Sequence, residues 1–226
     1  MRHLTIVVAV LAIPILAVTY SPAGEPNAAD NASEAVELFN GKDLSGWTFD
    51  LAEPDAKMED VWHVDDGVLV CLGRPAGYIR TKGEYENYVL TLQWRWKPGT
   101  KGGNNGVLVH ASEPRALGIW PKSIEVQLGA GNAGDFWIIG TELDVENEEE
   151  RKQDRRHINL TDDSEKPAGE WNDMEITCRG DEITVKVNGD LVNHATNCSV
   201  TKGAICLQSE GAECHFRDIT LKPLDE

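Results

Sequence analysis

Apolar and polar residues alternate with a period of two along most of the chain. The clearest run spans residues 89–96, where leucine and tryptophan at the even positions alternate with mostly polar residues. Residues 124–128 repeat the pattern, and residues 174–178 and 183–187 carry it on both sides of an Arg-Gly-Asp turn. This period places one set of residues in the core and the other on the opposite face of a strand. Many such strands separated by turns predict an all-β fold, a two-sheet antiparallel jelly-roll sandwich.

The turn residues refine this prediction. Asn188-Gly189 is typical of a tight two-residue hairpin. Residues 203–207 and 213–221 are expected to form a final strand pair around Gly211, across which Cys206 and Cys214 could face each other. The segment 141–166 is dense in charge and is expected to be a long surface loop.

The first residues are expected to lie outside the fold. An apolar run from Leu4 to Ala17 is followed by small residues at Ser21 and Ala23. The run is short for a membrane span, and the pattern predicts a signal peptide over residues 1–23. Residues 24–34 are expected to be a disordered leader, and residues 35–226 a single β-sandwich domain. A secreted or periplasmic location follows from the signal peptide.

Charge narrows the possible ligands. The formal net charge is −17, which disfavours nucleic acid because Lys and Arg are needed to displace phosphate counterions. It also disfavours an anionic membrane surface, so we expect no membrane partner after signal cleavage. Neutral ligands such as sugars, or cationic ones, remain. The five cysteines permit disulfides in an exported protein but do not determine their pairing.

The polar residues of several strands could form a ligand-binding face. If these strands are neighbours, four polar side chains share one outer surface: Arg95, His110, Glu125 and Gln127. Such side chains supply the mixed donors and acceptors that sugar hydroxyls need. Tryptophans in loop-like segments could provide flat surfaces for sugar rings: Trp120, Trp137 and Trp171. The same alternation also fits an ordinary solvated sheet face with its tryptophans in the core.

A set of motifs along the chain is more specific. They are Glu37–Trp47, Gln93–Trp96, Asn104–Val107, Ile124–Gln127, Leu207–Gly211 and Phe216–Ile219. In this order they resemble the 3-keto-disaccharide hydrolase family, over about Ala35 to Leu224. The resemblance implies a concanavalin-like jelly roll. It also implies an oligosaccharide or glycoside ligand whose 3-hydroxyl has been oxidised to a ketone.

The resemblance also implies a set of site residues. The matching positions are Arg95, Asn105, Glu125, Gln127, Gln208 and Glu210. Asn105 departs from the serine often found there in the family, which puts the role of that turn in doubt. We expect Glu125 to act as a base or metal ligand and His110 or Glu210 to protonate the leaving group. Arg95 and Gln127 would polarise the carbonyl, and a divalent metal ion could assist.

Two alternative functions fit the same fold. A conventional glucanase needs two carboxylates about 5 Å apart. In glucanases of this fold they alternate along one strand, but here Glu125 is followed by Gln127 where the second acid would be. A non-catalytic carbohydrate-binding module would need the polar face and the tryptophans but no base.

Overall fold

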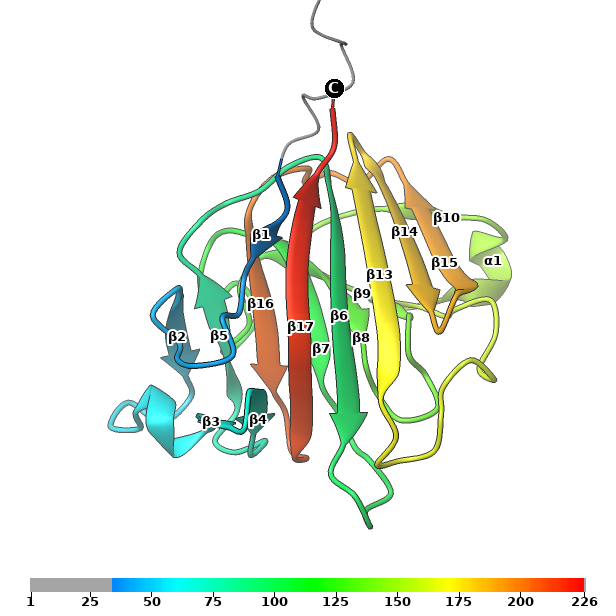
Figure 1. The fold of residues 1–226 in the computed structure, drawn as a ribbon. Helices are drawn as coiled ribbons and strands as arrows, with labels where there is room; N and C mark the ends of the chain where they lie inside the picture. Colours follow the sequence, from blue (N-terminus) through cyan, green and yellow to red (C-terminus); the bar gives the residue numbers. More distant parts are fainter. Residues whose placement is uncertain (1–33, 226) are drawn as a thin grey trace, which may run out of the picture. The chain divides into compact units, whose positions relative to one another are not determined.

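The computed structural model describes residues 34–225 and contains two stacked antiparallel sheets (Figure 1). The predicted all-β jelly-roll fold is confirmed. The predicted signal peptide lies outside the described residues, as does the predicted leader except for Glu34. No helix in the described part of the chain is long and apolar enough to cross a membrane.

The first sheet, called sheet A, faces the viewer in Figure 1. Its strands follow the order β10-β15-β14-β13-β6-β17-β4-β3, and β1 pairs with β17. Their bounds are β1 Val36–Glu37, β3 Trp62–Asp65, β4 Val68–Cys71, β6 Tyr88–Trp96, β10 Asp144–Val145, β13 Asn172–Arg179, β14 Glu182–Val187, β15 Asp190–Thr196 and β17 Cys214–Pro223.

The second sheet, called sheet B, lies behind sheet A in Figure 1. Its order is β11-β12-β9-β8-β7-β16-β5-β2. The bounds are β2 Trp47–Leu51, β5 Gly77–Thr81, β7 Gly106–Ala111, β8 Ser123–Gln127, β9 Phe136–Ile139, β11 Lys152–Gln153, β12 Arg156–His157 and β16 Ala204–Ser209. The described helical segments are a 3-10 turn, Met58–Asp60, and the short helix α1, Glu148–Arg151.

The main hydrophobic core lies between the sheets. Alternate residues of β6, β13 and β14 face it from sheet A, as the period of two predicts, and alternate residues of β7 and β8 face it from sheet B. The largest fully buried side chains include Trp62, Trp94 and Phe136. Burial of one large apolar side chain contributes about 1.5–3 kcal/mol. A core of this extent holds both sheets in fixed positions, and so fixes the side chains on their outer faces.

The predicted Asn188-Gly189 hairpin is confirmed, with positive φ at both residues between β14 and β15. The predicted pairing around Gly211 is wrong. Strand β16 belongs to sheet B and β17 to sheet A, so the turn crosses between the sheets. Cys206 therefore faces a second apolar cluster on sheet B, whereas Cys214 lies in the main core, and no disulfide joins them.

The charged segment 141–166 is only in part the expected loop. It contains β10, α1, β11 and β12, and β12 extends sheet B by pairing with β9. These strands have two residues each, too few for a period of two to be visible in the sequence. Their pairing places Arg155, between β11 and β12, next to β9.

Candidate active site

The candidate site lies on the outer face of sheet B. The strand register sets Leu108, Glu125 and Trp137 side by side across β7, β8 and β9. Their chain neighbours Val107, Val126 and Phe136 pack in the main core, so this row faces away from it. A small apolar cluster that includes Leu108 covers part of the same face, with Trp120 packed against it.

A hollow of about 100 Å³ opens beside Glu125, and we call it the inner hollow. Its lining consists of Asn104, Trp120, Glu125, Gln127, Trp137, Ile139, Arg155 and Glu210. The structure thus brings together four predicted site residues, from β8, β9 and the chain just after β16. Trp120 also lies where a ring face was expected. Two indoles, two carboxyls, two amides and one guanidinium make this a mixed polar and aromatic site of the kind that suits sugars.

Glu125 is the most perturbed acid of the site. Its side chain is almost fully buried. Burial, together with a smaller effect of the nearby Glu210 charge, raises the pKa of Glu125 from the ordinary 4.5 to about 8. Burial also raises the pKa of Glu210, which the Asn104 side chain partly offsets. The charge of Glu210 disfavours ionisation of Glu125, so the protonation of the two carboxyls is coupled.

A glycine makes room for this arrangement. A Cβ on Gly106 would lie 2.6 Å from an oxygen of Glu125 and 2.6 Å from the amide oxygen of Gln208, so only glycine leaves space for both. The Gln208 amide lowers the pKa of Glu125, yet among the described residues neither of its polar atoms has a partner in good hydrogen-bonding geometry. A buried amide without partners is costly unless a ligand pairs with it.

Gln127 is oriented by the backbone. Its amide oxygen accepts hydrogen bonds from the N–H groups of Leu128 and Gly129, both at 3.1 Å. Its NH₂ group is therefore the part that can donate to a ligand in the inner hollow. A donor beside the buried carboxyl of Glu125 is what a developing oxyanion needs.

The sequence did not single out Arg155, the only cationic side chain that lines the inner hollow. Its guanidinium lies 5.5 Å from the centre of the Trp137 ring, and its charge lowers the pKa of both Glu125 and Glu210. Arg155 comes from the segment expected to be a loop, and no periodicity marks it. Asn104, which shares a β-bridge with Glu210, was also missed because its neighbour Asn105 matched the family motif.

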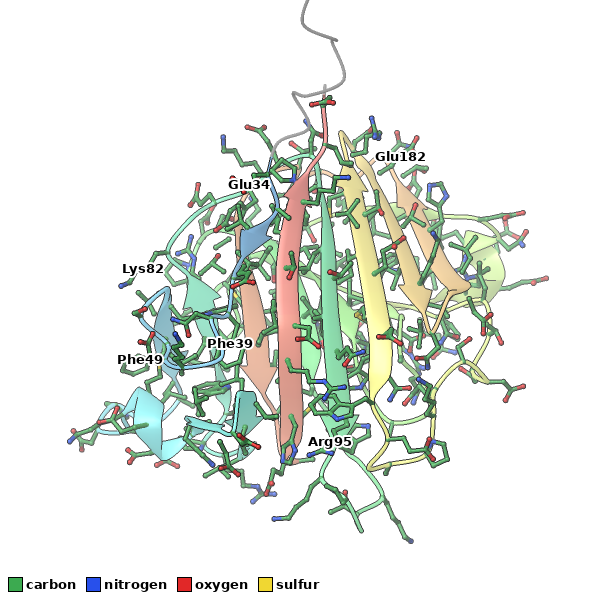
Figure 2. The ribbon with its side chains drawn as sticks, in the orientation of Figure 1. Glu34, Phe39, Phe49, Lys82, Arg95 and Glu182 are labelled. Carbon is green, nitrogen blue, oxygen red and sulfur yellow. The ribbon has the colours of Figure 1, made fainter. Side chains whose placement is uncertain are left out.

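Arg95 does not belong to this site, so the expectation that it shares a surface with Glu125 is wrong. It lies on β6 of sheet A, the sheet nearest the viewer in Figure 2. Its Nε donates to His215, and its guanidinium lies 4.5 Å from the centre of the Trp171 ring. Trp171 is therefore also outside the site. Alternation placed Arg95 on an outer face correctly, but did not indicate which sheet β6 joins.

His110 was also expected on this surface, and that expectation is wrong. It has a φ of 55° at an irregularity in the pairing of β7 with β16, which breaks the alternation. Its ring instead packs edge-on against buried Tyr88, and Nδ1 lies 3.0 Å from the carbonyl oxygen of Val200. Burial lowers the pKa of His110 to about 4, so it is neutral near pH 7 and does not act as an acid there.

Asn105 is buried and does not line the inner hollow. Its Nδ2 donates to the backbone oxygen of Gln208 at 2.9 Å, and its Oδ1 accepts from the N–H of Gly106. It therefore holds β7 and β16 in place below the site, whereas Asn104 presents its side chain to the inner hollow.

A divalent metal ion, which the sequence left open, finds no ligand set in the described residues. Within residues 34–225 no group of three or more His, Cys, Asp or Glu side chains could hold a metal ion. The inner hollow offers only Glu125 and Glu210 as charged oxygen ligands, and the Gln127 oxygen is already used by the backbone. Such a set does not fit a resident divalent ion, which takes several oxygen ligands.

Solved structures share this fold at low sequence identity. A candidate glycosyl hydrolase from Parabacteroides distasonis is 24% identical, with a TM-score of 0.62 over 84% of this chain and 94% of that one. A carbohydrate-binding module from Bacillus subtilis is 11% identical, with a TM-score of 0.57 over 78% and 95%. The β-glucanase of Bacillus licheniformis is 12% identical, with a TM-score of 0.56 over 87% and 100%.

A family comparison is more specific. No curated protein matches the sequence. Residues 34–222, nearly the whole described part, match the 3-keto-alpha-glucoside-1,2-lyase-like domain. The resemblance inferred from the motifs is confirmed, and the jelly-roll fold is the one that this chain shares with the glycosyl hydrolases above. The chain therefore belongs to the 3-keto-alpha-glucoside-1,2-lyase-like family.

Proposed function

We propose that this protein cleaves glycosides whose sugar carries a ketone at C3, by elimination across C1 and C2 in the inner hollow. The observation that carries the proposal is the buried Glu125 carboxyl, with a pKa of about 8, beside a second carboxyl and an unpartnered amide. Perturbed acids in a polar hollow are typical of catalytic sites. The family to which the chain belongs supports the same chemistry.

Glu125 and Glu210 can accept and supply the protons that this reaction moves. A ketone at C3 acidifies the C2 proton, and Glu125 removes it to leave an enolate. The enolate electrons then form the C1–C2 double bond as the bond from C1 to the glycosidic oxygen breaks. Glu210 gives its proton to that oxygen, which leaves as an alcohol. The product is an enone. Glu210 then takes a proton from a water whose oxygen adds to C1, and Glu125 returns its proton to C2, which gives the free 3-keto sugar and restores both carboxyls.

The side chains of the inner hollow match these steps. A carboxylate with a pKa of about 8 is a stronger base than an ordinary one, which suits removal of a proton from carbon. Arg155 and the NH₂ group of Gln127 supply positive charge and a donor for the enolate oxygen, whereas Gln208 is fully buried behind Glu125 and does not line the inner hollow. Trp120 and Trp137 offer ring faces for the sugar. Turnover needs Glu125 ionised and Glu210 protonated. Because burial keeps Glu125 protonated below about pH 8, this reactive form is a minority of the one-proton pair, and the rate should be bell-shaped in pH.

A conventional glycoside hydrolase is a second candidate, and one observation favours it. A second carboxylate does reach Glu125 from elsewhere in the fold, because Glu210 follows β16. A pair of carboxyls is what ordinary glycosidases use. The two mechanisms differ in the substrate they accept, since only elimination requires the ketone.

One experiment separates the candidates. Purified protein is given methyl 3-keto-α-glucoside or methyl α-glucoside, and both methanol release and the ultraviolet absorbance of an enone are followed. We expect turnover of the keto sugar alone, and its loss in Glu125→Gln. The matched control is Glu175→Gln, which changes a partly exposed glutamate on sheet A, where its carboxylate pairs with Lys186. Cleavage of the unoxidised sugar would favour the conventional mechanism, and binding without turnover would favour a carbohydrate-binding module.

Export is a separate proposal that rests on the predicted signal peptide alone. It would place the reaction in the periplasm or outside the cell. N-terminal sequencing of the protein from culture fractions would test it, with a new terminus after Ala23 as the expected result.

A further inference from the structure

A second, larger hollow of about 490 Å³ adjoins the site, and we call it the outer hollow. Its walls come from three segments at one end of sheet B: Ala52 and Glu53 after β2, residues 73–76 before β5, and Gly211 after β16. Glu210 lines both the inner and the outer hollow. Glu210 is therefore common to both hollows, so a ligand that occupied both would pass beside it.

The walls of the outer hollow are fixed by hydrogen bonds. The N–H of Ala52 donates to the oxygen of Ala76 at 2.8 Å, and the N–H of Gly211 donates to the oxygen of Gly73 at 2.7 Å. The Ser209 hydroxyl donates to the oxygen of Pro75 at 2.9 Å. These contacts join all three wall segments, so the outer hollow is preformed and binding need not order it.

The chemistry of the two hollows differs. The inner hollow is lined by amides, carboxyls, a guanidinium and indoles, whereas the outer one has Ala52, Pro75 and Ala76 with glycine backbone. Several of its backbone groups already bond to one another. Besides Glu210, two charged side chains line the outer hollow, Glu53 and Arg74, and both are exposed to solvent. Sugar hydroxyls placed there would lose water and gain few partners, whereas an apolar group would lose nothing.

We propose that the outer hollow is the leaving-group subsite and that it selects an apolar, aromatic aglycone over a second sugar. This rests on the proposed function, in which the keto sugar occupies the inner hollow. Glu210 then lies at the glycosidic oxygen between the two parts of the substrate, the position that protonation of the leaving group requires.

The test compares three 3-keto-α-glucosides that differ only in the leaving group: methanol, phenol or glucose. In the wild type we expect the phenyl substrate to have the lowest KM. Ala52→Trp fills the outer hollow from an exposed position and should raise the KM of the phenyl substrate about tenfold, leaving the methyl substrate unchanged. Ala76→Leu gives an independent, smaller obstruction, and Ala168→Trp places a tryptophan at an exposed site elsewhere.

The outcomes separate this inference from the proposed function. A lower KM for the glucose leaving group, or equal losses for phenyl and methyl substrates in both wall variants, would overturn the apolar subsite. Failure to turn over any of the three substrates would contradict the proposed function instead. In that case calorimetry with unoxidised phenyl and methyl α-glucosides still decides. Tighter phenyl binding that Ala52→Trp removes supports the subsite, and equal binding of both rejects it.

Discussion

The ionisation of Glu125 should make folding stability depend on pH in a way that one isosteric substitution removes. The folded protein holds this carboxyl with a pKa of about 8, whereas the unfolded chain has the ordinary 4.5. Below pH 4.5 Glu125 is protonated in both the folded and the unfolded state, so it does not make folding stability depend on pH. Between pH 4.5 and about 8 only the unfolded state releases it, so stability falls as pH rises. Above about pH 8 both states are ionised and the loss is complete.

The magnitude follows from the same two values. Each pH unit in this interval costs up to about 1.4 kcal/mol, so the full loss approaches about 5 kcal/mol. Glu125→Gln keeps the shape of the side chain but cannot ionise. Any cost of the new amide is independent of pH. The difference in unfolding free energy between variant and wild type should therefore shift in favour of the variant by about 3 kcal/mol from pH 4.5 to pH 7.

The assay is urea unfolding followed by tryptophan fluorescence at several pH values from 4.5 to 9. Glu175→Gln, on the outer face of sheet A, is the control: it loses a partly exposed ion pair with Lys186, worth at most about 1 kcal/mol, and should keep the wild-type dependence on pH between 4.5 and 9. If wild type and Glu125→Gln lose stability in parallel over the whole range, burial does not hold Glu125 in its protonated form, and Glu125 is not a strengthened base.

Three further predictions concern catalysis of the 3-keto substrate. Gly106→Ala should cost about a hundredfold in kcat/KM with an unchanged circular dichroism spectrum, because its Cβ displaces Glu125 and Gln208; normal kinetics would show that the two side chains are not held over this glycine. Glu210→Gln should move the pH limb that reports Glu125 to lower pH, since Glu210 raises the pKa of Glu125, and an unmoved limb would contradict the pairing. Arg95→Ala, on sheet A, should change kcat/KM less than about twofold. A tenfold loss would indicate that the reaction takes place on sheet A and not in the inner hollow on sheet B.

Much of the fold was predictable because the relevant interactions are local. The period of two in β6 and β8 identified their core residues, and Asn188-Gly189 identified its hairpin. The outer face of β8, with Glu125 and Gln127, was found in the same way, since alternation alone decides that both face away from the core.

What the sequence determined by itself is therefore the strand pattern, the family and the outer-face position of Glu125. Only the tertiary structure decided which sheet each strand joins, and this separated Arg95 from Glu125 although their patterns are alike. It also decided that His110 turns into the core at an irregularity and that Arg155 arrives from a charged segment. The physical reason is that alternation records the face of a strand, whereas neighbours across a sheet are set by packing between segments far apart in the chain.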